Sequence, residues 1–227
     1  MERELTYQRP SDIEGESMRI IAAELARMGI ALPADREPVV KRVIHTTADF
    51  DYAHSLRFTE GAVEAAVKAL RAGASIVTDT NMAKAGVSKT ALAKLGGGAF
   101  CFMADPEVAR EAKGRNVTRA AVCMEKAAAE YPGAALAVGN APTALLKLCE
   151  LMEGGLRPAF VVAVPVGFVN VEESKERMVE ACQRHGVPCV AAMGRKGGSN
   201  VAAAICNALL YAALDATDPA GRQEKLS

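Results

Sequence analysis

The chain has 227 residues, which suits one large domain or two small ones, and 50% of them are hydrophobic, so a substantial core can be buried. Lys plus Arg and Asp plus Glu both number 27, so the formal net charge is zero and no overall basic field exists to hold a nucleic acid or an anionic membrane surface. Tryptophan is absent and aromatic residues make up 4% of the chain, which also argues against a surface on which bases stack.

The first predicted element is an amphipathic helix over residues 11–29. Ser11 is the expected N-cap, and Glu14, three residues later, completes a capping box. Gly29 then ends the helix. Residues 1–10 before this helix and residues 215–227 at the other end of the chain are expected to fray.

Residues 35–47 predict a second helix, which carries one of the three histidines. Apolar side chains recur at positions 39, 40, 43 and 44 and define its buried face. Arg42 and His45 are three residues apart on the polar side and are neighbours there. His45 is therefore either a solvated surface group or one wall of a site, and composition alone favours the surface.

From residue 59 onward, predicted helices alternate with short apolar strands. The strands are expected at "SIVTD", "AFCFM", "ALAVG", "AFVVAVPV" and "PCVAAMG". No linker or repeat interrupts the alternation, so residues 1–227 are expected to form a single domain. This pattern predicts an α/β fold with a mainly parallel five-stranded sheet, covered by helices on both faces.

The carboxyl ends of such strands line the crevice in which ligands bind. Several segments at these ends, such as "TDTNMAKAG", "VGNAPT" and "GRKGGSN", are rich in Gly, Asn and Thr, as close approach of the backbone to a ligand requires. The candidate ligand contacts there, together with one at the start of the helix "TRAAVCM", are Thr80, Arg119, Asn140, Arg195, Lys196 and Ser199.

Three of these segments also fit a purely structural explanation. In "VGNAPT", Asn140 and Pro142 at a helix start fit a capped turn. "GRKGGSN" precedes a helix, so its amides, Arg195 and Lys196 could bind an anion, or it could be a tight turn capped by Ser199. It lacks the residue order of a phosphate-binding loop. Arg119 follows the expected N-cap Thr118, where a positive charge opposes the helix dipole, so it either meets a ligand or is solvated.

The other histidines and the six cysteines indicate no metal site. His54 fits a loop and His185 fits the end of a helix, and no two histidines stand four residues apart. The cysteines lie mostly in apolar stretches and predict reduced thiols of a cytoplasmic protein. The charged N-terminus lacks a signal region and no apolar run reaches membrane-spanning length, so no membrane association is expected.

Taken together, six blocks resemble the precorrin-8X methylmutase family of vitamin B12 biosynthesis. They are "VKRVIHTTADFDYA", "TDTNMAKAGVSK", "TRAAVCM", "AVGNAPTAL", "PVGFVNVEESKE" and "GRKGGSNVAAAICNALL", in family order, and "IEGESMRII" near the N-terminus is similar to a further block. The resemblance spans about Ile13 to Leu210. It implies a flavodoxin-like three-layer sandwich, a homodimer, and an isomerase that moves a methyl group within a corrinoid ring without an external cofactor.

The resemblance also implies roles for individual residues. The acid/base residue of the family corresponds to His45, and two family substrate contacts correspond to Ser17 and Arg42. Arg119 is expected near the acid side chains of the ring. Met18 stands where phenylalanine is common in the family, a change that should affect packing only.

The blocks "GRKGGSN" and "GFVNVEESK" resemble the branch of the family that acts on a cobalt-bound substrate. The expected reaction moves a methyl group from ring carbon 11 to ring carbon 12, converting cobalt-precorrin-8 to cobyrinate; the metal-free counterpart converts precorrin-8X to hydrogenobyrinate. Cobalt would travel with the substrate. Imidazole can give and take a proton near neutral pH, which favours a chemical role for His45.

Two other functions would explain part of the sequence. A non-catalytic corrinoid carrier would have the same crevice but would not require His45. A phosphate- or nucleotide-binding α/β enzyme would use the "GRKGGSN" loop but would leave His45 without a role.

Overall fold

The computed structural model describes residues 9–226, so most of the N-terminal segment predicted to fray lies outside the described residues. The helices are α1 (Pro10–Arg27), α2 (Glu37–Thr47), α3 (Tyr52–Ser55), α4 (Ala62–Arg71), α5 (Asn81–Gly86), α6 (Lys89–Lys94), α7 (Pro106–Arg115), α8 (Arg119–Glu130), α9 (Pro142–Glu153), α10 (Val171–His185), α11 (Ser199–Ala213) and α12 (Pro219–Leu226). The strands are β1 (Leu56–Phe58), β2 (Ile76–Thr78), β3 (Ala99–Phe100), β4 (Ala135–Val138), β5 (Val161–Ala163) and β6 (Cys189–Ala192).

The strands form one mixed sheet of six strands in the order β1-β6-β5-β4-β2-β3. Strands β2 to β6 are parallel, and β1 pairs with β6 in antiparallel orientation at the edge. The prediction of five strands was therefore wrong. The missed strand, β1, has three residues, which are too few for a recognisable alternation. Its hydrogen bonds come from residues far away in the chain, and the pairing continues beyond the strand with a bond from Met193 N to Ser55 O (2.8 Å).

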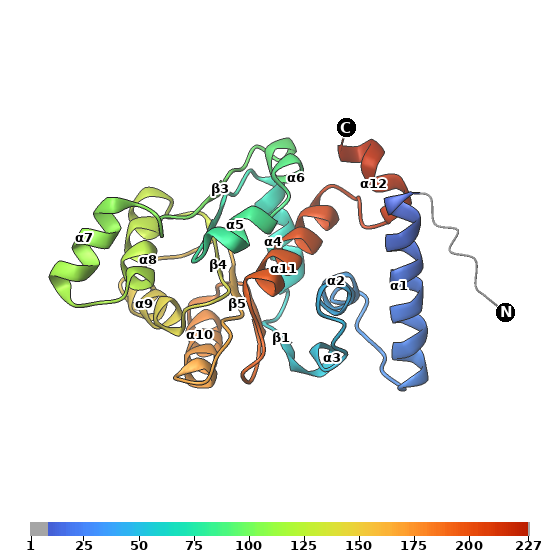
Figure 1. Ribbon diagram of the computed structural model, residues 1–227, viewed down its shortest axis with the longest axis horizontal. Coiled ribbons are helices and arrows are strands. Elements are labelled where there is room, and N and C mark those ends of the chain that lie inside the picture. Colours follow the sequence, from blue (N-terminus) through green and yellow to red (C-terminus); the bar gives the residue numbers. More distant parts are fainter. Residues whose placement is uncertain (1–8, 227) are drawn as a thin grey trace.

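Alternating strand residues build a separate core on each face of the sheet. In β4, Ala135 and Ala137 join the core under α2, α4, α5, α6 and α11, whereas Leu136 and Val138 join the core under α8, α9 and α10. Figure 1 shows the two groups of helices on opposite sides of the sheet, with α7 outside α8. Strands β2, β4, β5 and β6 are buried on both faces, which explains their apolar sequences, whereas β3 at the edge is half-buried.

Helices α1 and α12 lie outside this layered arrangement. Helix α1 packs on α2, which packs on α11, and α12 packs beside α1 (Figure 1). The structure thus contains a helix, α12, in the C-terminal segment that was expected to fray. Its Arg222 is buried, with 7% of its surface exposed. Because the helix is held by contacts with distant elements, its own polar sequence gave no sign of it.

Helix α1 begins differently from the sequence prediction. Its first residue is Pro10, and its N-cap, Arg9, makes no side-chain capping bond, so the predicted capping box was wrong. The carboxylate of Glu14 binds Arg42 and Arg222. Two cations supplied by other helices offer this carboxylate stronger hydrogen bonds than a backbone amide would. Among residues 9–226, no helix is both long and apolar enough to cross a membrane.

Candidate active site

His45 lies in a groove between α1 and α2. Its Nδ1 atom is 2.8 Å from the Oγ atom of Ser17, which is on α1. The groove has a volume of about 370 Å³. Its walls are mostly apolar and are lined by Ile13, Ile20, Ile21, Ile44, Ala48 and Phe50. The valine-rich face of α2 packs inward as predicted, so the polar side of the helix carries His45 into this groove.

The Ser17 hydroxyl suits either neutral form of the imidazole. If Ser17 donates to Nδ1, the proton of the ring is on Nε2; if Nδ1–H donates to Ser17, Nε2 is an acceptor. The pKa of His45 is lowered, first by partial burial and then by the positive charge of Arg42, with Glu14 opposing and Arg222 adding to the decrease. The neutral imidazole is therefore favoured, able to give or accept a proton at Nε2.

Arg42 is part of an ion-pair cluster beside this groove. Its Nη2 atom is 2.5 Å from Oε1 of Glu14, and the Nη1 atom of Arg222 is 2.5 Å from the same oxygen. Burial by itself would raise the pKa of Glu14, but the hydrogen bonds from Arg222 and Arg42 outweigh it and the pKa is lowered. The structure thus brings Arg42 close to His45, as predicted, but already pairs it with a carboxylate.

A second group of predicted residues lies at the carboxyl ends of the strands. Thr80 is the N-cap of α5 and its Oγ1 atom is 2.7 Å from Oγ of Ser199, the first residue of α11. The N-cap of α11 is Gly198, with no side-chain capping bond, so Ser199 does not have the capping role considered from the sequence. The start of α11 therefore retains backbone amides that can meet an anion.

Asp79 is a buried carboxylate between these segments that was not among the residues predicted from the sequence. Its side chain is 1% exposed and accepts hydrogen bonds at 2.8 Å from the backbone amides of Gly139, Asn140 and Ala141. Burial raises its pKa, and the three amide bonds oppose the rise. The amides before α9 are thus already occupied, and Asn140 offers only its side chain to a ligand. An aspartate directly after a buried strand was the available signal.

Lys196 and Arg195 both have carboxylate partners in the structure. The Nζ atom of Lys196 is 2.6 Å from both Asp49 and Asp51, which follow α2. The Nε atom of Arg195 is 2.9 Å from Glu172. The Lys196 pairs connect the loop after β6 to the end of α2 and so hold the two groups of predicted residues in one region.

The loop after β6 is also held by Lys175, which was not among the residues predicted from the sequence. Lys175 is fully buried and its Nζ atom donates to the carbonyls of Gly194 (2.7 Å) and Lys196 (2.8 Å). Burial lowers its pKa from 10.5 to about 8, opposed only by Glu172. A lysine within a charged helical stretch carries no sequence signal of burial.

The shifted pKa of Lys175 predicts that part of the stability rises with pH. Between about pH 8 and 10.5 the unfolded chain holds a proton on Lys175 that the folded chain has released, so the free energy of unfolding increases with pH in that range. The full change is on the order of 3 kcal/mol. Urea denaturation at about pH 7, 9 and 10.5 measures it, with Lys175→Met as the comparison. Parallel pH dependences for wild type and variant would contradict the assignment.

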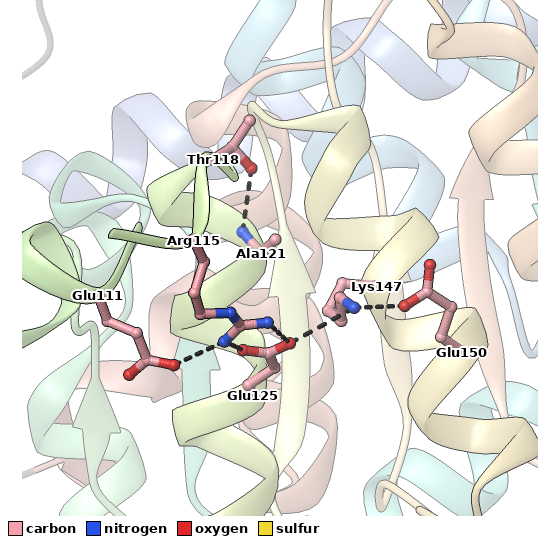
Figure 2. Close-up of polar contacts among 7 residues, drawn as sticks. All are labelled: Glu111, Arg115, Thr118, Ala121, Glu125, Lys147 and Glu150. Atoms are coloured by element: carbon pink, nitrogen blue, oxygen red, sulfur yellow. Dashed lines mark hydrogen bonds and ion pairs between the residues drawn. The ribbon is translucent and has the colours of Figure 1, made fainter. Parts of the chain in front are cut away.

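Arg119 is exposed at the first position of α8, as the sequence predicted. Thr118 caps this helix by accepting a hydrogen bond from the Ala121 amide at 3.2 Å. Figure 2 shows this cap above a chain of ion pairs across α7, α8 and α9. The chain runs Glu111–Arg115–Glu125–Lys147–Glu150. These ion pairs stabilise α8, the helix that carries Arg119. No ion pair of Arg119 itself is found among residues 9–226.

No group of three or more metal-binding side chains is found among residues 9–226. The six cysteines are free. His54 lies within the short helix α3, where the sequence fitted a loop. His185 is the last residue of α10, before Gly186, as predicted.

Comparison with known proteins gives a consistent set of relatives. The family model for precorrin-8X methylmutase matches residues 12–212. A cobalt-precorrin-8 methylmutase of Salmonella typhimurium is 46% identical over 209 residues, covering 90% of this chain and 96% of that protein. A precorrin-8X methylmutase of Pseudomonas aeruginosa is 40% identical over 195 residues, covering 86% and 91%. A crystal structure of precorrin-8X methyl mutase from Thermus thermophilus aligns with a TM-score of 0.80 and 42% identity, covering 89% and 98%.

These matches extend over the groove of His45 and over the loops at the carboxyl ends of the strands. They favour an enzyme over the carrier and the nucleotide-binding protein considered from the sequence. The chain belongs to the precorrin-8X methylmutase family, the intramolecular methyl transferases of cobalamin biosynthesis.

Proposed function

We propose that this enzyme moves a methyl group from ring carbon 11 to ring carbon 12 of cobalt-precorrin-8, with His45 as the proton donor and acceptor. The observation that carries the proposal is the pairing of His45 with Ser17, 2.8 Å apart, in an apolar groove. The reaction is an isomerisation: the bond from the methyl group to carbon 11 breaks as the bond to carbon 12 forms, so no atom enters or leaves.

Such a shift needs the ring held in one tautomer and one orientation. The apolar walls of the groove suit the face of a macrocycle, and a neutral imidazole can exchange a proton with the ring through Nε2. Ser17 supports both protonation patterns because a hydroxyl can donate and accept. The lowered pKa of His45 keeps its imidazole neutral before an anionic substrate binds.

The choice of the cobalt-bound substrate rests on the relatives. Proteins of Salmonella typhimurium and Priestia megaterium named cobalt-precorrin-8 methylmutase are 46% and 42% identical to this chain. A protein of Pseudomonas aeruginosa named precorrin-8X methylmutase is 40% identical. Assays of both substrate forms, followed by the change in the ultraviolet-visible spectrum, test the proposal. Turnover of the metal-free ring alone would reject the cobalt form, and spectral perturbation without turnover would indicate a carrier.

We infer that the acid side chains of the ring meet the polar residues at the carboxyl ends of the strands. Arg119 is exposed and the start of α11 is uncapped, so both can accept a carboxylate without breaking an existing pair. Thr80, Asn140 and Ser199 supply neutral donors nearby. Arg42, Arg195 and Lys196 are further proposed contacts, which would have to share or exchange the carboxylates that they now bind.

Replacing Arg119 with alanine should weaken binding of the corrinoid product about tenfold to a hundredfold, the cost of one lost charge-assisted hydrogen bond. Arg195→Ala is the matched control and should change the dissociation constant about fivefold at most, because Arg195 is exposed and already pairs with Glu172. Arg119→Lys should rescue binding only in part, since an ammonium group lacks the planar fork. The measurement is a spectral titration with product; equal affinities for wild type and Arg119→Ala would remove Arg119 from the site.

We also infer a homodimer, a flavodoxin-like fold and a cytoplasmic location. The order of the five parallel strands supports the fold, because numbered by themselves they run 2-1-3-4-5 across the sheet. Six free cysteines support a reducing compartment. Light scattering at the assay concentration should give twice the mass of one chain, and a fully active monomer would reject the dimer.

A further inference from the structure

The C-terminal helix α12 brings a buried arginine, Arg222, within electrostatic range of His45. Residue 212 is the last residue that the family model matches, so α12 lies beyond the matched range. The side chain of Arg222 is only 8% exposed. Its three donor nitrogens are all used: Nε donates to Ala216 O (3.0 Å), Nη2 to Thr217 O (3.1 Å) and Nη1 to Glu14 (2.5 Å).

Arg222 and Arg42 form one unit with Glu14 and Tyr211. Both guanidinium groups contact the same carboxylate oxygen of Glu14, and both lie over the ring of Tyr211, at 4.1 Å for Arg222 and 5.4 Å for Arg42. Arg42 is one helical turn before His45 on α2. Contacts therefore run without a gap from α12 through Glu14 on α1 to the helix that carries His45.

We propose that Arg222 is a positioning residue of the methylmutase site: through Glu14 it fixes Arg42 beside His45, which makes the C-terminal helix α12 part of the active-site architecture. The proposal rests on the proposed role of His45 as the acid/base group. A buried guanidinium that donates from each of its three nitrogens is held in one orientation, and it fixes the position of the carboxylate it binds.

The charges that act on His45 come from three helices. Arg42 on α2 and Arg222 on α12 both lower its pKa, and Glu14 on α1 raises it. Two further carboxylates on α1, Glu16 and Glu24, line the same groove. Removal of Arg222 takes away one positive charge and leaves Glu14 less neutralised, and both changes raise the pKa of His45. Loss of Arg222 should therefore change the pKa of His45, which the loss of a purely structural contact would not do.

The test replaces Arg222 with methionine, which keeps an apolar chain over Tyr211 and removes the charge. The His45 titration, followed by NMR in the substrate-free protein and assigned with His45→Gln, should move to higher pH. The turnover number should fall about tenfold to a hundredfold, as expected for displacement of a catalytic group, and the acid limb of the pH–rate profile should move in the same direction as the titration. Arg222→Lys should restore the charge and part of the turnover.

Arg71→Met is the matched control. Arg71 also holds the C-terminal segment, because it donates to Ala213 O at 2.8 Å and to Asp215 at 3.0 Å. It has no contact with Glu14. It should leave the His45 titration and turnover unchanged. Equal effects of Arg71→Met and Arg222→Met would overturn the proposal, because any loosening of the tail would then suffice. Unchanged turnover in Arg222→Met would overturn it too. Activity of His45→Gln would reject the acid/base role of His45. That result is independent of the NMR titration of Arg222→Met, so the two proposals can fail separately.

Discussion

Replacement of His45 with alanine should lower turnover of the corrinoid substrate by about a hundredfold to ten-thousandfold, the usual contribution of a positioned acid/base group. His45 has the surroundings for that role: an apolar groove, a hydroxyl partner at 2.8 Å and a pKa lowered by burial and by Arg42. Product binding should remain measurable, because the proposed carboxylate contacts are made by residues other than His45. Ultraviolet-visible spectra recorded during the reaction give the turnover, and a product titration of the same sample gives the binding.

His54→Ala is the control for this experiment. His54 is an exposed residue at the end of α3, outside the residues that line the groove, and its loss should leave turnover within about twofold of wild type. Ser17→Ala should give an intermediate loss, because the imidazole would keep its proton chemistry but lose the hydroxyl that orients it. Near-normal turnover in His45→Ala would contradict the acid/base assignment and leave orientation of the ring as the only contribution of the groove.

Replacement of Asp79 with alanine should destabilise the fold by about 3–5 kcal/mol, one of the larger effects of a single substitution. Three backbone amides, from Gly139, Asn140 and Ala141, would lose their common acceptor in a fully buried place. The raised pKa of Asp79 indicates that burial of its charge is itself costly, so Asp79→Asn, which keeps one acceptor without the charge, should cost less than alanine. Urea denaturation monitored by circular dichroism gives the three free energies of unfolding.

The control for Asp79 is Asp105, which also accepts a hydrogen bond from a backbone amide but is only half-buried. Asp105 caps α7 by accepting from the Glu107 amide at 3.0 Å and pairs with Lys126. Asp105→Ala should destabilise the fold much less than Asp79→Ala, because water can reach the amide that loses its cap. If both alanine variants had the same stability, the buried amide cluster would not hold the ends of β2 and β4 together, and the positions of Thr80 and Asn140 would need another explanation.

Features that depend only on neighbouring residues could be predicted from the sequence. Helical spacing of Val39, Val43 and Ile44 predicted α2 and placed His45 on its polar side, and the structure confirms both. Thr118 was recognised as an N-cap because a cap needs only its own first turn. The alternation of apolar strands with helices indicated an α/β fold with helices on both faces, since parallel strands must be buried on both sides.

Features that depend on a partner far away in the chain became visible only in the folded protein. Strand β1 exists because β6 supplies its ladder. Glu14 does not form the predicted capping box because it binds Arg42 and Arg222, which are 28 and 208 residues away in the chain. Asp79, Lys175 and Arg222 became buried because amides, carbonyls or a carboxylate elsewhere satisfy them, and a buried charge is tolerated only with such partners. Local pattern carries no information about those partners, so the position of His45 was predictable while the residues that hold its surroundings in place were not.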